Sequence, residues 1–230
     1  MDLLIGGDLG EWALDQVSSA DVGHVYTVEP ALGEKAKRKG FATCLTDVNE
    51  AKESAAVGIS IHYPRILTAA TLRRYRKVYN LHPGLLPWGR GFFPIFWALW
   101  EKTPAGATLH EVDERLDTGP IVAQLRVEAT ETDTGGSLFA RVREAERKLF
   151  LDFFSKLKAD EELPAKPQPA GGSYHSRQEF FDLKAGFDWR NERGEDLVRL
   201  VRCLTFPGYS GMEVRLGDTV FDLSLKGSPR

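Results

Sequence analysis

Short apolar runs alternate with helix-like segments over the first 82 residues, and this alternation constrains the fold more than any other feature of the sequence. Helices are expected at 9–17, at 31–39 before a closing Gly40, and after Thr68, which is placed to cap one. Strands that alternate with helices favour right-handed crossovers and a parallel sheet, whose ligands gather beyond the carboxyl ends of the strands. The expected strands are 3–7, 24–28, 56–62 and 77–82.

The chain then continues the same pattern. A very apolar helix is expected at 93–101, strands at 105–112 and 120–127 around a tight turn, and a long amphipathic helix at 134–157. These elements extend the first part into one domain, residues 1–158. The predicted fold class is therefore α/β, with a Rossmann-like, mostly parallel sheet.

The composition changes abruptly after this domain. Residues 159–172 are rich in proline, glycine and charge, which is typical of a linker. Residues 173–230 then hold a helical pattern and a hairpin pattern around Gly217, so we expect a small α+β carboxyl-terminal subdomain. Because a helix and a hairpin bury little surface alone, the subdomain is expected to dock on the body or on a second chain. Its helix and strands are expected at 195–204, 213–215 and 219–223.

Charge and cysteine content restrict the classes of function. A formal net charge of −3 argues against gripping a nucleic-acid backbone, because such binding usually needs a basic face. The sequence has no apolar run near the roughly 18 to 20 residues of a membrane span and no signal-peptide pattern at its start. Cys44 and Cys203 form neither a disulfide framework nor a metal-ligand spacing. We therefore expect a cytoplasmic protein that uses no metal, no nucleic acid and no membrane.

An amide and an imidazole stand at the end of the strand expected at 77–82. Asn80 and His82 lie two residues apart, so both side chains project from the same sheet face, and Pro83 ends the strand. This places both groups at the carboxyl edge of the sheet, where a binding site is expected. Taken alone, the pair is equally compatible with a strand end that carries a capping asparagine and a surface histidine.

Two further segments follow predicted strands. In residues 62–68, HYPRILT, Ile66 and Leu67 are unusually apolar for a loop, and they either wall a flat pocket or pack onto the core. Asp117 lies in the turn Asp-Thr-Gly-Pro, which is an ordinary turn sequence by itself. Three neighbouring polar residues are interpreted as solvated or structural: His110, Asp113 and Glu114.

Together these segments resemble the folate-dependent formyltransferases. The resemblance rests on Asn80-Leu81-His82-Pro83, Leu86-Pro87, Gly91 and Asp117-Thr118-Gly119-Pro120, which stand in the order and approximate spacing of that family. It implies the formyltransferase fold and transfer of a formyl group from 10-formyltetrahydrofolate to an amine, with Asn80, His82 and Asp117 as the catalytic residues. It also implies folate contacts from Arg65, Ile66, Leu67, Val112 and Asp113.

The residue types suit this chemistry. Asn80 can donate a side-chain N–H to the formyl oxygen, and that hydrogen bond strengthens as negative charge develops there. His82 can take a proton from the attacking ammonium or supply one to the leaving nitrogen, because the unperturbed pKa of an imidazole, ~6.5, lies near working pH. Asp117 would orient His82 and favour its charged form.

The segment LPWGRGFFPIFWAL and the tail resemble the sugar N-formyltransferase branch of that family, although Gly89 and Ile95 stand where amides are expected. This resemblance implies a nucleotide-linked amino sugar as substrate, with dTDP-4-amino-4,6-dideoxyglucose favoured, and lipopolysaccharide O-antigen biosynthesis as the setting. It also implies a homodimer that the tail helps to form. Substrate contacts are expected from Trp88, Arg90, Gly91, Phe93 and Tyr209.

Other substrates fit the sequence less well. Residues 6–11 carry two carboxylates and make a poor cradle for the phosphate of glycinamide ribonucleotide. A short tail on an acidic chain also fits a tRNA substrate poorly. The remaining alternatives are formyl transfer to another amine, such as methionyl-tRNA, and a catalytically inactive folate-binding regulator.

Overall fold

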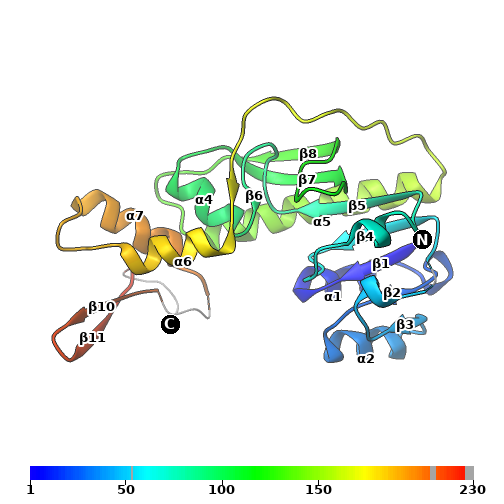
Figure 1. Cartoon of the computed structure of the whole chain (residues 1–230), viewed down its shortest axis with the longest axis horizontal. Helices are drawn as coiled ribbons and strands as arrows, with labels where there is room; N and C mark the ends of the chain where they lie inside the picture. The colour runs from blue at the N-terminus through cyan, green and yellow to red at the C-terminus, as the bar shows by residue number, and fades with distance from the viewer. Residues whose placement is uncertain (53, 208–210, 226–230) are drawn as a thin grey trace. The chain divides into compact units, whose positions relative to one another are not determined.

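The computed structural model describes residues 1–52, 54–207 and 211–225, so Tyr209 lies outside the described residues. Its main feature is a seven-stranded sheet with strand order β3-β2-β1-β4-β5-β7-β8 (Figure 1). The strands from β3 to β5 pair in parallel, and β7 joins β5 antiparallel. The predicted mostly parallel α/β sheet is therefore confirmed. The strands are β1 (Asp2–Ile5), β2 (Val25–Tyr26), β3 (Thr43–Cys44), β4 (Val57–Ile61), β5 (Lys77–His82), β7 (Ala105–Glu111) and β8 (Ile121–Val127).

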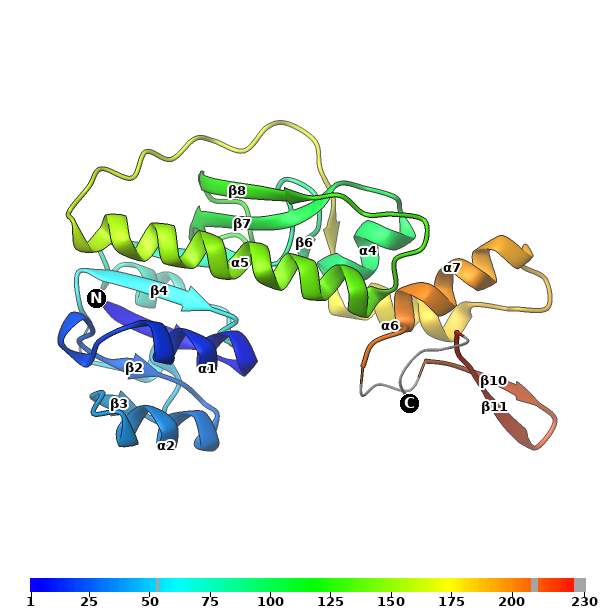
Figure 2. The same ribbon diagram turned by 180° about the vertical axis from the view of Figure 1, so that it is seen from behind.

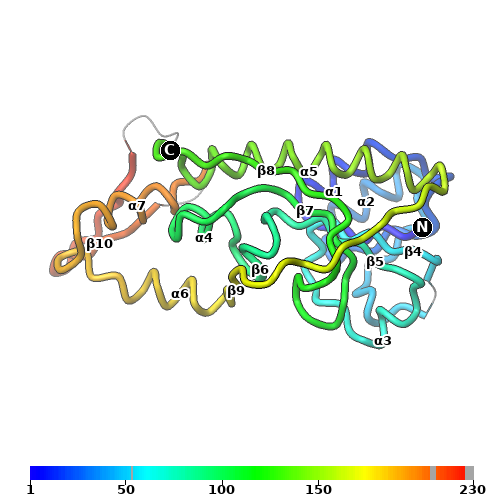
Figure 3. Tube along the Cα trace, turned by 90° about the horizontal axis from the view of Figure 1, so that it is seen from above, coloured from blue at the N-terminus to red at the C-terminus, as the bar shows by residue number. Residues whose placement is uncertain are grey.

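Helices connect these strands much as the apolar pattern indicates. The helix α1 (Gly7–Gln16) packs against β1, and α2 (Pro30–Arg38) packs against β2 and β3 (Figure 2). The short helix α3 (Ala69–Leu72) follows β4 and precedes β5 along the chain (Figure 3). The Thr68 side chain caps it as predicted. The long helix α5 (Gly135–Lys158) matches the predicted amphipathic helix closely.

The strand register explains which residues meet at the carboxyl edge of the sheet. Every residue of β1 and β4 is buried, which fixes the centre of the sheet in the core. Ser60 of β4 pairs with Asn80 of β5, so the loop that follows β4 leaves the sheet beside the end of β5. Across the antiparallel pair, Asn80 faces His110 of β7. The antiparallel strand therefore brings a second histidine to the same edge.

A buried carboxylate ties the opposite, amino-terminal edge of the sheet together. Asp2 is fully buried, and its carboxylate accepts hydrogen bonds from the amides of His24 (3.0 Å) and Ala55 (2.8 Å) and from the Tyr75 hydroxyl (3.1 Å). Burial, with the Asp2 charge beside it, raises the pKa of Tyr75 far above its usual range, so this hydroxyl stays a donor. These bonds link the first strand to three later segments of the chain.

The chain divides into two compact units. The first comprises 1–82, 107–125 and 146–169, and the second comprises 83–106, 126–145 and 170–230. The predicted domain boundaries at 158 and 172 stay a prediction. The elements that belong wholly to the second unit are β6 (Arg90–Gly91), α4 (Pro94–Trp100), β9 (Tyr174–His175), α6 (Arg177–Gly186), α7 (Gly194–Leu204), β10 (Met212–Leu216) and β11 (Thr219–Leu223).

The second unit contains both predicted and unpredicted elements. The hairpin of β10 and β11 and the helix α7 are confirmed. The helix α6 and the parallel pairing of β6 with β9 were not predicted from the sequence. No helix within the described part of the chain is long and apolar enough to cross a membrane.

Candidate active site

Asn80 and His82 end β5 as the sequence predicts. Asn80 is half-buried, whereas His82 is only 4% exposed. The interpretation of this pair as a strand end with a surface histidine is therefore wrong for His82. Both side chains belong to the first unit, at the carboxyl edge where parallel α/β sheets bind ligands.

Asp117 reaches His82 from the turn between β7 and β8. Its Oδ2 atom lies 3.7 Å from His82 Nδ1, and its carboxylate is 8% exposed. The turn needs a left-handed backbone at Asp117, which has φ 55°, and a glycine at position 119. A Cβ added to Gly119 would lie 1.8 Å from the Glu111 carbonyl oxygen. The Gln168 side chain braces the turn by donating to the carbonyl oxygens of Asp117 (2.8 Å) and Gly119 (2.9 Å). The turn thus holds the carboxylate at the imidazole.

His110 is a site residue that the sequence analysis interpreted as solvated or structural. It is 1% exposed, and its Nε2 atom lies 3.2 Å from Asn80 Nδ2 and 3.6 Å from Asp117 Oδ1. His110 Nδ1 lies 2.8 Å from the Glu111 carbonyl oxygen, which can only accept a hydrogen bond. In the neutral ring Nε2 is then an acceptor, and Asn80 Nδ2 donates to it. His110 therefore sets the orientation of the Asn80 amide.

The arrangement provides a donor and a proton carrier side by side. With one Nδ2–H directed to His110, the second N–H of Asn80 can point at an oxygen of a bound molecule. Because Nδ1 of His82 faces Asp117, proton exchange with a bound molecule would use Nε2, on the other side of the ring. The Asp117 carboxylate stabilises the imidazolium that such an exchange creates.

The loop after β4 has one apolar side chain facing inward and one facing solvent. Leu67 packs against a buried cluster that includes Leu4, Val48 and Tyr63, as expected for a loop residue held on the core. Ile66 is 66% exposed, so an apolar surface is presented at the carboxyl edge. Leu67 therefore packs onto the core, whereas Ile66 remains available to wall a flat pocket. Its neighbour Arg65 is also exposed.

Two other residues expected to contact the folate belong to the same unit. The amide of Val112 donates to the Val78 carbonyl oxygen at 2.8 Å, which extends the pairing of β5 with β7. The Asp113 carboxylate accepts hydrogen bonds from the Thr118 hydroxyl (2.7 Å) and the Arg115 amide (3.1 Å). This side chain shapes the turn that carries Asp117.

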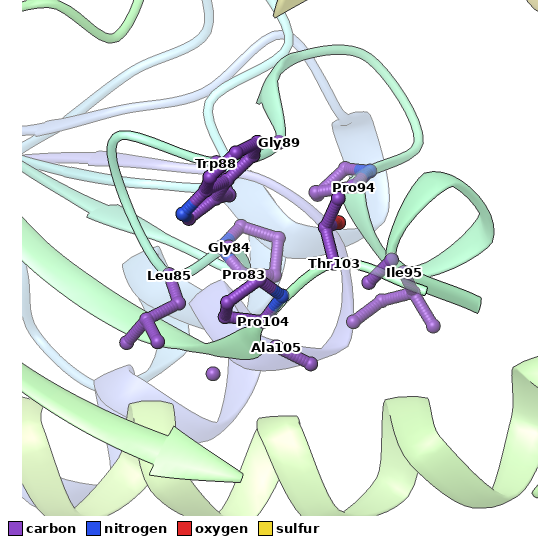
Figure 4. Close-up of a pocket in the computed structure, with 12 residues that line it drawn as sticks. Pro83, Gly84, Leu85, Trp88, Gly89, Pro94, Ile95, Thr103, Pro104 and Ala105 are labelled. Atoms are coloured by element: carbon purple, nitrogen blue, oxygen red, sulfur yellow. The ribbon is translucent and has the colours of Figure 1, made fainter. Parts of the chain in front are cut away.

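The residues expected to contact the sugar nucleotide that the structure describes belong to the second unit. Trp88 is half-buried and stands over a small pocket next to Pro83, whose walls pack so closely that no room for a water molecule is left (Figure 4). Arg90 and Gly91 form β6. Phe93 is exposed before α4 and packs on Phe180, with ring centroids 4.3 Å apart. The pocket is part of the packing of this unit rather than a binding cavity.

The family model for formyl transferases matches residues 31–153, which is more than half of the chain. The chain belongs to the formyl transferase family.

Across residues 1–52, 54–207 and 211–225, no group of three or more His, Cys, Asp and Glu side chains is placed to hold a metal ion.

Curated relatives refine the similarity. A dTDP-4-amino-4,6-dideoxyglucose formyltransferase of Mycobacterium tuberculosis is 35% identical over 147 residues, which cover 64% of this chain and 61% of the relative. A methionyl-tRNA formyltransferase of Paraburkholderia phymatum is 37% identical over 131 residues, which cover 56% of this chain and 39% of the relative. The match thus spans less than two thirds of the length of either relative.

Solved structures share the fold over more of the chain. A Mycobacterium tuberculosis protein attributed to the sugar N-formyltransferases has a TM-score of 0.80 at 27% identity, covering 97% of this chain and 95% of its own. The formyltransferase PseJ of Anoxybacillus kamchatkensis, solved with UDP-4,6-dideoxy-4-formamido-L-AltNAc and tetrahydrofolate, has a TM-score of 0.57 at 27% identity, covering 75% and 93%. The predicted family and fold are confirmed.

Proposed function

We propose that this chain transfers a formyl group from 10-formyltetrahydrofolate to the amino group of a nucleotide-linked amino sugar. The observation that carries the proposal is the cluster of Asn80, His82 and Asp117 at the carboxyl edge of a formyl transferase sheet. PseJ, which was solved with a formamido sugar nucleotide and tetrahydrofolate, supports both the donor and the class of acceptor.

Each residue of the cluster has a part in the transfer. The folate supplies the activated formyl group and a nitrogen leaving group. The second N–H of Asn80 binds the formyl oxygen and stabilises the charge that develops there. His82 accepts the proton of the attacking ammonium through Nε2 and returns a proton to the leaving nitrogen. Asp117 holds the ring in place and stabilises its charged form.

The described residues offer a suitable place for the folate. The loop of Arg65, Ile66 and Leu67 leaves β4 beside the end of β5, and exposed Ile66 gives a flat ring an apolar contact. Val112 and Asp113 follow β7 directly and lead into the turn that carries Asp117. Backbone groups of these two segments would bind the polar edge of the ring.

The sugar nucleotide is proposed to be dTDP-4-amino-4,6-dideoxyglucose, the substrate named for the 35% identical relative. Arg90 suits the pyrophosphate, because a guanidinium binds such groups bidentately, with Trp88, Gly91 and Phe93 nearby in sequence and Tyr209 from the tail. The proposal also includes a role in lipopolysaccharide O-antigen biosynthesis and a location in the cytoplasm.

A homodimer is part of the proposal. The hairpin of β10 and β11 exposes Leu216, Val220 and Phe221, and a two-stranded hairpin is marginally stable without further packing. Covering these side chains with the same surface of a second chain would remove them from water. Size-exclusion chromatography with light scattering gives the mass directly.

One observation favours a second substrate, because the methionyl-tRNA formyltransferase match has the higher identity, 37%, over a shorter stretch. A net charge of −3 argues against a tRNA. The proposal is tested by incubating the protein and 10-formyltetrahydrofolate with each of three amines: the dTDP-linked 4-amino sugar, its 3-amino isomer and methionyl-tRNA. Mass spectrometry should find formylation of the 4-amino sugar, and Asn80→Ala should slow it about 10²- to 10³-fold. Formylation of methionyl-tRNA instead would overturn the sugar assignment, and folate binding without turnover on any amine would indicate a regulator.

A further inference from the structure

A turn that comes before β4 in the sequence is hydrogen-bonded to the loop that comes after β4. The turn is the 3-10 helix η2 (Val48–Glu50), and Asn49 extends its side-chain amide from there. Asn49 Nδ2 donates to the carbonyl oxygen of Ile66 at 3.0 Å, and the amide of Thr68 donates to Asn49 Oδ1 at 3.0 Å. One side chain therefore bonds the backbone on both sides of Leu67.

The partners fix the orientation of the Asn49 amide. A carbonyl oxygen only accepts and a backbone N–H only donates, so Nδ2 must face Ile66 and Oδ1 must face Thr68. The hydroxyl of Thr71, which is fully buried, donates a further bond to Oδ1 at 2.7 Å. Because Thr68 also caps α3, the bridge continues into the first turn of that helix.

The turn that carries Asn49 is itself firmly held. The amide of Val48 donates to the Tyr63 hydroxyl at 2.9 Å, and that hydroxyl donates to Asp47 at 3.3 Å. The guanidinium of Arg74 donates to the carbonyl oxygens of Val48 and Ala51. Asn49 thus projects from a turn that is hydrogen-bonded to Tyr63, which follows β4, and to Arg74, which precedes β5.

The loop needs this support because its own side chains contribute little at its tip. Arg65 and Ile66 are exposed, and Leu67 is the loop residue that packs on the buried cluster. A backbone that must present its N–H and C=O groups to a flat ring binds more tightly when its conformation is fixed beforehand.

We propose that Asn49 is a positioning residue for the folate: its amide holds the 65–68 loop in the conformation that binds the ring. This inference rests on the proposed function for the identity of the ligand. Asn49 itself does not contact the reacting atoms, so its loss should weaken folate binding and leave the transfer step intact.

Asn49→Asp tests the role with a single-atom change. The carboxylate keeps an acceptor for Thr68 and Thr71, but it places an oxygen against the Ile66 carbonyl oxygen in place of a donor. Asn49→Ala removes the bridge without adding charge, so a folding defect in one variant leaves the other informative. Thr43→Val is the matched control, because it removes one side-chain bond to a backbone carbonyl, that of Phe41 at 3.0 Å, at the edge strand β3.

Three readouts are compared with wild type: the dissociation constant of 5-formyltetrahydrofolate, the kinetic constants for 10-formyltetrahydrofolate, and hydrogen exchange of the Thr68 amide in the ligand-free protein. We expect the dissociation constant and KM for the folate to rise about fivefold to tenfold in Asn49→Asp, which loses one hydrogen bond, and by at least as much in Asn49→Ala, which loses three. We expect kcat to stay within about twofold and the Thr68 amide to exchange faster. Thr43→Val should change none of these.

The outcomes separate this inference from the proposed function. Unchanged folate affinity in the Asn49 variants, an equal loss in Thr43→Val, or a fall in kcat alone would overturn the positioning role while the wild-type activity stands. If the wild-type chain binds no folate, the proposed function fails and so does the inferred ligand. Unchanged exchange at Thr68 would overturn the bridge itself, whatever the ligand.

Discussion

Replacing His110 by phenylalanine should lower the turnover number by disordering Asn80. The substitution keeps a planar ring in a site that is 1% exposed, but it removes the Nε2 acceptor that lies 3.2 Å from Asn80 Nδ2. Asn80 then loses the bond that fixes its amide. Its second N–H no longer points at one place for the formyl oxygen.

The size of the effect has a lower and an upper bound. Loss of one net hydrogen bond is worth about 1 to 1.5 kcal/mol, which is a fall in kcat of about fivefold to tenfold. A residue that acts through Asn80 cannot cost more than Asn80 itself, and removing a donor of this type costs about 10²- to 10³-fold. We therefore expect kcat of His110→Phe to fall between these limits.

The assay is a double-mutant cycle on kcat at saturating substrates. His110→Phe, Asn80→Ala and the double variant are compared, with thermal unfolding as a check on folding. If His110 acts through Asn80, His110→Phe has no further effect once Asn80 is alanine. Additive losses would refute this reasoning, and they would point instead to the contact of 3.6 Å with Asp117.

Three other predictions follow from the charged groups. Asp117→Asn should lower kcat about 10²-fold or more with little change in folate affinity, because an amide cannot stabilise a charged His82; near wild-type kcat would contradict this. Burial alone would raise the pKa of Asp133, but hydrogen bonds from Ser137, Thr130 and Arg141 lower that pKa from 3.8 to about 2. Asp133→Asn should therefore lower the free energy of unfolding at pH 7, measured with urea, by about 2 kcal/mol. That difference from wild type should persist above pH ~4 and disappear as the pH falls through ~2, whereas a constant difference would contradict the linkage. Asp2→Ala should lower the free energy of unfolding by about 2 to 4 kcal/mol, because one buried and two part-buried donors lose their acceptor, and an unchanged thermal midpoint would contradict this.

Local patterns were enough to predict much of the sheet. The strand at 77–82 and its polar end were predicted because Pro83 stops an apolar run and two side chains spaced by two share a face. The Thr68 cap and the hairpin around Gly217 also depend on neighbouring residues only. In each of these features, the residues that contact one another are also close together in the sequence.

Features that depend on distant pairing could not be predicted in this way. His110 joins the site because β7 runs antiparallel to β5, and nothing near His110 in the sequence indicates that register. Gln168 lies in a segment interpreted as a linker, yet its amide braces the Asp117 turn. The helix α6 was missed although Ser176 and Glu179 form a capping box, because none of its residues is buried and no apolar stripe marks it.

The most direct test of the central claim follows the formyl carbon from donor to product. The protein is mixed with 10-formyltetrahydrofolate labelled with ¹³C in the formyl group and with dTDP-4-amino-4,6-dideoxyglucose, and the product is examined by NMR. We expect a labelled formamide on the sugar with the wild-type chain, and we expect it to form about 10²-fold or more slowly with Asn80→Ala or His82→Ala. A label that stays on the folate, or a variant that transfers it at the wild-type rate, would contradict the assignment of these residues to formyl transfer.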